Sequence, residues 1–133
     1  MLPNPTAARV LILDDDAIVA RSMARLLTSG CVVAVETDAK AALRRLSRGE
    51  SFDVITCDVM MPDTSGLQFY EAVVAFDPVL AMRIVFVTGG ALSTGAEKFL
   101  QGTANTLLMK PFDPARLRGI VARLAARPPA LVG

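Results

Sequence analysis

Five polar side chains follow short apolar runs of the sequence and are the candidates for chemistry: Asp14, Asp15, Asp58, Thr88 and Lys110. Each stands at or just past the end of an aliphatic run that is typical of a buried strand. The carboxyl ends of parallel strands share one edge of a sheet, and ligands bind there where the strand order reverses. We therefore expect three carboxylates, a hydroxyl and an ammonium group to meet in one crevice.

This set of groups predicts a particular kind of chemistry. Three carboxylates in one crevice repel one another, so either one of them is protonated or a cation lies among them. Oxygen ligands of this kind favour Mg²⁺, which binds one or two carboxylates together with a phosphate. A carboxylate beside such an ion can attack a phosphoryl group. Lys110 and the hydroxyl of Thr88 would then neutralise the charge on the transferring oxygens.

An alternation of short apolar runs and longer amphipathic stretches indicates the elements that position these side chains. Five β-branched or aliphatic runs are typical of strands: Val10–Leu13, Cys31–Val35, Val54–Cys57, Ile84–Val87 and Thr106–Met109. Helical spacing and helix caps predict five helices: Ala17–Leu27, one capped by Asp38 that stops near Gly49, Leu67–Phe76, one capped by Thr94 that ends at Gly102, and one that opens with Asp113-Pro114 and stops before Pro128.

The predicted strands are apolar on both faces, which is typical of a parallel sheet covered by helices on both sides. Five β-α units with right-handed crossovers favour a doubly wound, flavodoxin-like α/β fold with strand order 2-1-3-4-5. In this order the first strand separates Cys31 from Cys57 by about 9–10 Å. A disulfide needs Cα atoms within about 7 Å, so both cysteines are expected to be free thiols.

Length and composition exclude several classes of protein. The chain has 133 residues, 53% of them hydrophobic and 20% charged, with a net charge of +1. This predicts one folded domain over residues 9–127, with a lead-in of residues 1–8 and a tail of residues 128–133. The small net charge argues against a nucleic-acid-binding domain. The absence of His from the sequence excludes a histidine base and a His-ligated zinc site.

The sequence contains no candidate for a membrane-spanning segment. Mean hydropathy is +0.46, but the longest charge-free run, Ile84–Ala96, is shorter than the roughly 18 apolar residues of a spanning helix. Two lone cysteines fit a reducing compartment. We therefore expect a cytoplasmic protein that does not enter the membrane.

The motifs together resemble the receiver domain of response regulators in two-component signalling. The matching pieces are Asp14-Asp15 after Val-Leu-Ile-Leu, Asp58 before Met61-Pro62 and Gly66, Thr88 after Ile-Val-Phe-Val, and Lys110-Pro111-Phe112. Each piece alone is weak, but their order and separations are specific, and the resemblance covers residues 9–127. The Thr-Gly-Gly-Ala segment that begins at Thr88 looks like the terminal receivers of hybrid sensor histidine kinases.

The resemblance implies a role for each candidate residue. Asp58 would accept a phosphoryl group, while Thr88 and Lys110 would contact its oxygens. The Lys110-Pro111 peptide bond would be cis. The groups that would hold Mg²⁺ are the carboxylates of Asp14, Asp15 and Asp58 and the backbone carbonyl of Met60.

The resemblance also implies partners. A phosphohistidine of a histidine kinase or of a histidine phosphotransfer domain would donate to Asp58, and a conformational shift would then signal in a phosphorelay. Such a domain catalyses only its own phosphorylation and dephosphorylation, and is not an enzyme for an outside substrate. The donor would dock near four residues: Ile18, Arg21, Phe112 and Pro114. We expect a monomer or weak dimer, with no direct contact to nucleic acid.

Two alternative functions stay open. Family members often carry Tyr or Phe three residues before the lysine, where this chain has Leu107. That departure would suit a pseudo-receiver that binds partners without being phosphorylated. The run Asp14-Asp15-Asp16 resembles the start of a haloacid-dehalogenase-like phosphohydrolase, but the Thr expected two residues after the second acid and the later acidic pair are missing from the sequence. Asp16 is most simply a favourable charge at a helix start.

Overall fold

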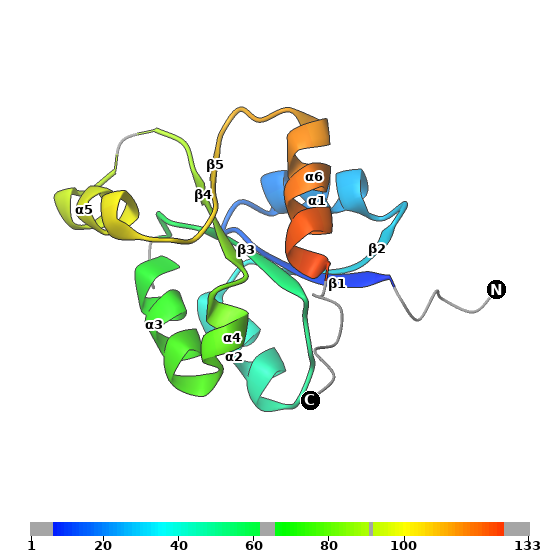
Figure 1. The fold of residues 1–133 in the computed structure, drawn as a ribbon, viewed down its shortest axis with the longest axis horizontal. Coiled ribbons are helices and arrows are strands. Elements are labelled where there is room, and N and C mark those ends of the chain that lie inside the picture. Colours follow the sequence, from blue (N-terminus) through cyan, green and yellow to red (C-terminus); the bar gives the residue numbers. More distant parts are fainter. Residues whose placement is uncertain (1–6, 62–65, 91, 127–133) are drawn as a thin grey trace, which may run out of the picture.

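The computed structural model describes residues 7–61, 66–90 and 92–126. Within these ranges five strands form one parallel sheet in the order β2-β1-β3-β4-β5 (Figure 1). The strands are β1 (Ala8–Leu13), β2 (Cys31–Glu36), β3 (Val54–Asp58), β4 (Ile84–Thr88) and β5 (Leu107–Met109). The helices are α1 (Ala17–Leu27), α2 (Ala39–Ser47), α3 (Gly66–Phe76), α4 (Pro78–Ala81), α5 (Thr94–Gly102) and α6 (Pro114–Ala125). The predicted fold class and strand order are confirmed.

Helices cover both faces of this sheet, because the central strands bury side chains of both faces. In β1, Val10 and Ile12 pack in a core cluster with residues of α1 and α6. Leu11 and Leu13 alternate with them and pack with residues of α2, α3, α4 and α5. Figure 1 shows α1 and α6 on one side of the strands and α2, α3 and α4 on the other. This arrangement leaves the ends of the strands as the open edges of the domain.

Side-chain caps fix where most helices begin. Asp38 and Asp113 each accept backbone N–H groups of the following turn, as the sequence predicts. Asp16, expected only as a favourable charge at the helix start, caps α1 in the same way. The predicted cap at Thr94 is wrong, because the hydroxyl of Ser93 accepts the N–H of Ala96 instead and Thr94 is the first helical residue. Capping works from the last non-helical residue, and here that residue is one position earlier than the sequence suggested.

The short helix α4 was missed by the sequence analysis. Asp77 caps it by accepting the N–H of Leu80 at 3.1 Å, and Pro78 occupies its first turn. Four residues are too few to show a helical period. The consequence is that Leu80 and Ala81 are buried against the core while Val79 and Met82 point to solvent.

Both cysteines are free, as predicted, with Cys57 buried and Cys31 partly buried. The structure describes residues 7 and 8 of the predicted lead-in and ends before Arg127, so the expected tail lies outside the described residues. In the described part of the chain, none of the helices has the length and apolar character needed to cross a membrane.

Candidate functional site

The candidate side chains meet at the carboxyl edge of the sheet. Asp14 and Asp15 follow β1, Asp58 ends β3, Thr88 ends β4 and Lys110 follows β5. One carboxylate oxygen from each of the three aspartates lies within 4.8 Å of the other two. Asp14 is buried, Asp58 is half-buried and Asp15 is exposed. The strand order therefore brings together residues that are up to 96 positions apart.

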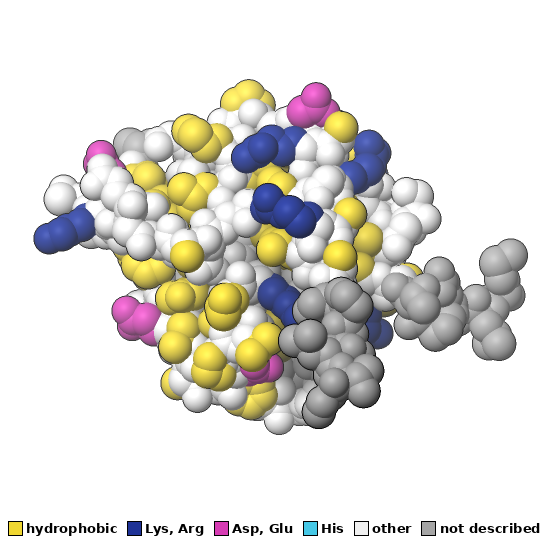
Figure 2. Space-filling view, viewed as in Figure 1, with side chains coloured by type: hydrophobic (Ala, Val, Ile, Leu, Met, Phe, Trp, Pro, Cys, Tyr) yellow, Lys and Arg dark blue, Asp and Glu magenta, His cyan; other side chains and the backbone are white. Residues whose placement is uncertain are grey.

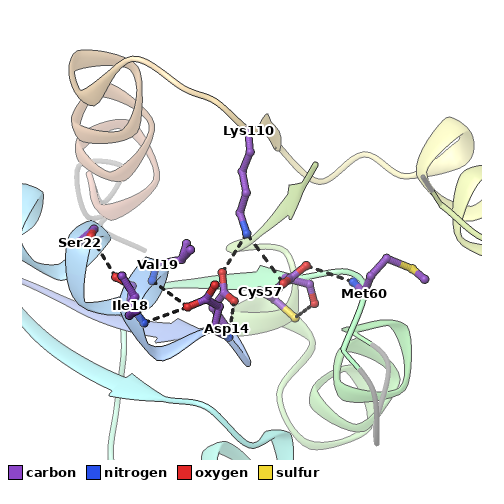
Figure 3. Close-up of polar contacts among 9 residues, drawn as sticks. Asp14, Ile18, Val19, Ser22, Cys57, Met60 and Lys110 are labelled. Atoms are coloured by element: carbon purple, nitrogen blue, oxygen red, sulfur yellow. Dashed lines mark hydrogen bonds and ion pairs between the residues drawn. The ribbon is translucent and has the colours of Figure 1, made fainter. Parts of the chain in front are cut away.

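Lys110 is the cation of this cluster, and its side chain reaches across the edge of the sheet (Figure 3). Its Nζ lies 3.0 Å from Oδ2 of Asp14 and 3.9 Å from Oδ2 of Asp58. The backbone N–H of Lys110 donates to the carbonyl of Thr88 at 2.8 Å, which ties the end of β5 to the end of β4. The Lys110-Pro111 peptide bond is cis, in agreement with what the resemblance implies.

The peptide after Asp58 holds that carboxylate in place. The backbone N–H of Met60 donates to Oδ1 of Asp58 at 3.1 Å (Figure 3). Gly66 then packs against the same segment, where a Cβ atom would lie 2.5 Å from the carbonyl oxygen of Asp58 and 2.9 Å from Cα of Val59. Only a glycine fits at this distance. The sequence analysis used Gly66 only as part of a motif, since a close backbone approach leaves no signal of its own in one sequence.

A second local support holds Asp14 in its buried position. The N–H of Asp16 donates to Oδ1 of Asp14 at 2.9 Å, while Lys110 takes the other oxygen. Asp16 itself caps α1 through the N–H groups of Ile18 and Val19. Its carboxylate is used by the helix, as the sequence analysis expected, and it is not part of the three-carboxylate group.

Burial, together with the neighbouring negative charges, raises the pKa of Asp58 to about 6. The largest cause is burial, followed by the negative charge of Asp14, with Asp15 as the smallest contribution in the same direction. The Met60 N–H and Lys110 act against this rise. Two like charges at 4.8 Å repel by about 3 kcal/mol at an effective dielectric of about 20.

The donor set fits a hard divalent cation. The three carboxylates carry more negative charge than Lys110 alone can balance, and their oxygens converge on one volume. Mg²⁺ accepts such ligands and keeps part of its water shell, and the exposed Asp15 leaves the cluster open to water. The observed carboxylate geometry therefore suits the ion that the sequence predicts.

Thr88 and Lys110 also line an open hollow of about 720 Å³ between β5, α5 and α6. Leu107 lines the same hollow and is half-buried. A larger aromatic side chain at this position would fill part of that volume. The departure that the sequence analysis noted at Leu107 therefore corresponds to open space beside the candidate site.

Exposed apolar side chains lie on α1 and β5, two of the elements next to the candidate site. Ile18 is 77% exposed and Met109 69% exposed. Phe112, one of the four residues of the expected docking rim, is only half-exposed, because it packs against the core cluster of α1 and α6. Arg21 and Pro114 of the same rim are exposed. The sequence alone does not single out Met109, because a residue at the end of a three-residue strand has no face that its period can assign.

Comparison with known proteins places the chain beside one family. The model of the response regulator receiver domain matches residues 10–122. The response regulator protein FleR of Pseudomonas aeruginosa is 34% identical over 90% of this chain and 25% of its own length. Transcription factor SKN7 of Saccharomyces cerevisiae is 30% identical over 86% of this chain and 18% of its own length. This chain spans a quarter or less of these relatives.

A solved structure shows the same likeness in three dimensions. A response regulator receiver domain protein of Methanospirillum hungatei superposes with a TM-score of 0.75 at 29% identity, and covers 89% of this chain and 94% of its own. This similarity extends over almost the whole of both chains, so the fold and the family agree.

Proposed function

This chain belongs to the response regulator receiver domain family, and we propose that it accepts a phosphoryl group on Asp58 in a two-component phosphorelay. The observation that carries the proposal is the cluster itself. Asp58 shares a volume with two further carboxylates and with the ammonium group of Lys110. A half-buried carboxylate that is held by the N–H of Met60 and faces a cation is a suitable nucleophile for phosphorus.

In the proposed reaction an oxygen of Asp58 attacks the phosphorus of a phosphohistidine. The new bond joins phosphorus to the carboxylate oxygen, and the bond between phosphorus and the ring nitrogen of the donor breaks. Lys110 and Thr88 stand at the ends of the two neighbouring strands, where they meet the charge on the phosphoryl oxygens. Water later releases the group from Asp58, so no outside substrate is turned over.

Asp14, Asp15 and Asp58, with the backbone carbonyl of Met60, are the groups that would hold Mg²⁺. When bound, this ion supplies positive charge that allows an anionic phosphoryl group to approach an anionic carboxylate. Before transfer, the ammonium group of Lys110 contacts the buried carboxylate of Asp14 at 3.0 Å and so holds both side chains at the site. The N–H of Met60 orients Asp58 toward the open edge.

The donor in this proposal is a histidine kinase or a histidine phosphotransfer domain. It would approach over the rim that includes Ile18, Arg21, Phe112 and Pro114. The 77% exposure of Ile18 supports this placement, since an exposed aliphatic residue next to a reaction site suits a contact surface. The receiver would be either a stand-alone protein or a part of a hybrid histidine kinase. The likeness of the Thr-Gly-Gly-Ala segment to the terminal receivers of such kinases favours the second arrangement.

The experiment that tests the proposal is intact mass spectrometry after incubation with acetyl phosphate and Mg²⁺. The wild type should gain a single phosphoryl adduct, and Asp58→Asn should gain none. An adduct on Asp58→Asn would move the acceptor to another residue. If neither protein is labelled and beryllofluoride also fails to bind, the chain is a pseudo-receiver.

A further inference from the structure

The exposed sides of α1 and α6 carry positive charge that the two helices do not balance. Five of the 14 Lys and Arg residues of the chain lie on these helices, and all five are exposed. The sequences of both helices contain no Asp or Glu. Figure 2 shows Lys and Arg side chains gathered over α6 and beside it. We call this surface the α1–α6 arginine face, and it consists of Arg21, Arg25, Arg116, Arg118 and Arg123.

The arginines of this face form no ion pair with a carboxylate of the described residues. Arg116, Arg118 and Arg123 each donate one hydrogen bond to a neutral oxygen, at 3.5, 3.0 and 3.1 Å. With five of the 14 basic residues on this face, nine remain in the rest of the chain against 13 Asp and Glu, although the net charge of the whole chain is +1. The positive charge of the face is therefore local, and it is available to a charged partner.

The α1–α6 arginine face adjoins the candidate site. Helix α1 begins two residues after Asp15, and α6 begins four residues after Lys110. The two helices cover the same side of the sheet (Figure 1), and Nε of Arg118 donates to the backbone carbonyl of Leu26 on α1 at 3.0 Å. Both helices therefore start at the carboxyl edge, and the surface that they form together reaches the edge where Asp58 lies.

Apolar groups lie among the arginines. Ile18, which is 77% exposed, stands three residues before Arg21 on α1, so the two side chains are neighbours on the helix surface. A hollow of about 250 Å³ opens between α1 and α6, and its lining includes Leu26, Arg118 and Val121. A surface that mixes cationic and apolar groups suits a protein partner better than a nucleic acid, whose outer surface offers mainly phosphate charge.

We propose that the α1–α6 arginine face binds an acidic surface of the phosphohistidine donor, an inference that rests on the function proposed above. A guanidinium group binds a carboxylate through two parallel hydrogen bonds. Arg21 and Arg25 stand one helical turn apart, and carboxylates one turn apart on a partner helix match this spacing. The donor is the favoured partner because its histidine has to reach Asp58, and the face leads to that edge of the sheet. Complementary charge also raises the rate of productive encounters.

A nucleic acid or an anionic membrane fits the same surface less well. Either of them would extend beyond the arginines to the carboxyl edge, where Asp14, Asp15 and Asp58 repel negative charge. An acidic patch on a protein can end where these carboxylates begin. The charge on the two ends of α1 and α6 therefore favours a protein partner over an extended polyanion.

Phosphoryl transfer from two synthetic helical peptides to the full chain tests the proposal. Both peptides have about 20 residues and one phosphohistidine, and they differ only in carrying Glu or Gln at every fourth position. Transfer to Asp58 is followed by intact mass as a function of peptide concentration. The Glu peptide should reach half of its maximal rate at a concentration about tenfold lower than the Gln peptide. Raising the NaCl concentration from about 50 mM to about 500 mM should remove most of that difference.

Two matched double variants locate the effect. Arg21→Ala/Arg25→Ala should raise the half-maximal concentration of the Glu peptide to that of the Gln peptide. Lys40→Ala/Arg44→Ala removes the same charge at the same spacing from exposed positions of α2, on the other face of the sheet, and should transfer like the wild type. Alanine is a good helix former, so both variants should keep their fold. Equal losses in the two variants would mean that only the total charge matters, and the proposed surface would be wrong.

Acetyl phosphate separates this proposal from the function proposed above, because so small a donor needs no docking surface. If acetyl phosphate labels the wild type but the Glu and Gln peptides transfer alike, the proposed function stands and the docking surface is wrong. If acetyl phosphate labels nothing, the proposed function fails, and the identity of the partner fails with it. Tighter binding of duplex DNA, by fluorescence anisotropy, or of phosphatidylserine vesicles, by co-sedimentation, than of the unphosphorylated Glu peptide would also overturn the proposal.

Discussion

The two ends of the sheet are exposed to the same solvent but present opposite chemistry. At the carboxyl edge three carboxylates and one ammonium group crowd together, and the pKa of Asp58 is raised to about 6. At the amino end Phe76, Val79 and Met82 expose apolar surface, and Asp77 is occupied by a helix cap. One end contains charge that needs a counter-ion, and the other exposes apolar surface. The comparison suggests that pH, salt and metal ions act mainly at the carboxyl edge.

Backbone packing also differs between the carboxyl edge and the middle of α6. Near Asp58 the chain makes a close approach at Gly66 that excludes any side chain. On α6, by contrast, Gly119 has no atom within 4 Å of the position where a Cβ would stand. A Gly→Ala substitution should therefore have very different effects on stability at Gly66 and at Gly119.

Gly66→Ala should produce the largest loss of stability. Its methyl group would lie 2.5 Å from the carbonyl oxygen of Asp58, so the backbone beside Asp58 has to move. We expect a loss of about 3 kcal/mol in the free energy of unfolding, together with slower labelling by acetyl phosphate. Urea denaturation measures the first effect. Gly119→Ala is the control and should gain about 0.5–1 kcal/mol; equal effects would mean that the close approach at Gly66 is unimportant.

Removing the cation of the carboxyl edge should have the next largest effect. In Lys110→Met the buried carboxylate of Asp14 loses its 3.0 Å partner and the crowding of charge increases. We expect the metal-free protein to lose about 2 kcal/mol at neutral pH, less than for a fully buried pair because the lysine is partly exposed. Thermal unfolding measures the change. Lys98→Met on exposed α5 should change stability by less than about 0.5 kcal/mol.

The pH dependence of the metal-free protein should show the same strain. Asp58 binds its proton more tightly in the folded state, with a pKa of about 6 against the ordinary 3.8. Its contribution to stability is therefore present at low pH and is lost as the pH rises from about 4 to about 7. This change of pKa corresponds to about 3 kcal/mol, and solvent screening of the half-buried carboxylate reduces the expected loss to about 1–2 kcal/mol. Asp58→Asn should lack this part of the slope, and identical pH profiles would show that Asp58 is not strained.

The residues that meet at the carboxyl edge could be predicted from the sequence, because their meeting depends only on which strands they follow. Asp14, Asp58 and Lys110 end apolar runs, and a parallel sheet brings such ends together whatever the details of packing. The same rule placed Cys31 and Cys57 on strands that do not touch, and both are free. Contacts that depend on fractions of an ångström, such as the approach of Gly66 to Asp58, follow no periodic pattern.

The amino end escaped prediction for a different physical reason. Phe76 ends the predicted helix Leu67–Phe76, and although it is a large apolar residue it is 59% exposed. The four-residue α4 turns Val79 and Met82 outward while it buries Leu80 and Ala81. Apolar sequence indicates burial on average, but it does not say which side of a short turn faces solvent. These exposed side chains therefore became visible only in three dimensions.

The smallest expected effect tests whether the crowding at the carboxyl edge is local. Asp15 is exposed and contributes least to the raised pKa of Asp58. Asp15→Asn should therefore stabilise the metal-free protein by less than about 1 kcal/mol, and added salt should remove most of that gain because exposed charges are screened. With Mg²⁺ present the sign should reverse, since the variant has one ligand fewer. Thermal unfolding with and without the ion measures both. A variant that is less stable without Mg²⁺ would mean that Asp15 stabilises the fold. The electrostatic repulsion at the carboxyl edge would then act between Asp14 and Asp58 alone.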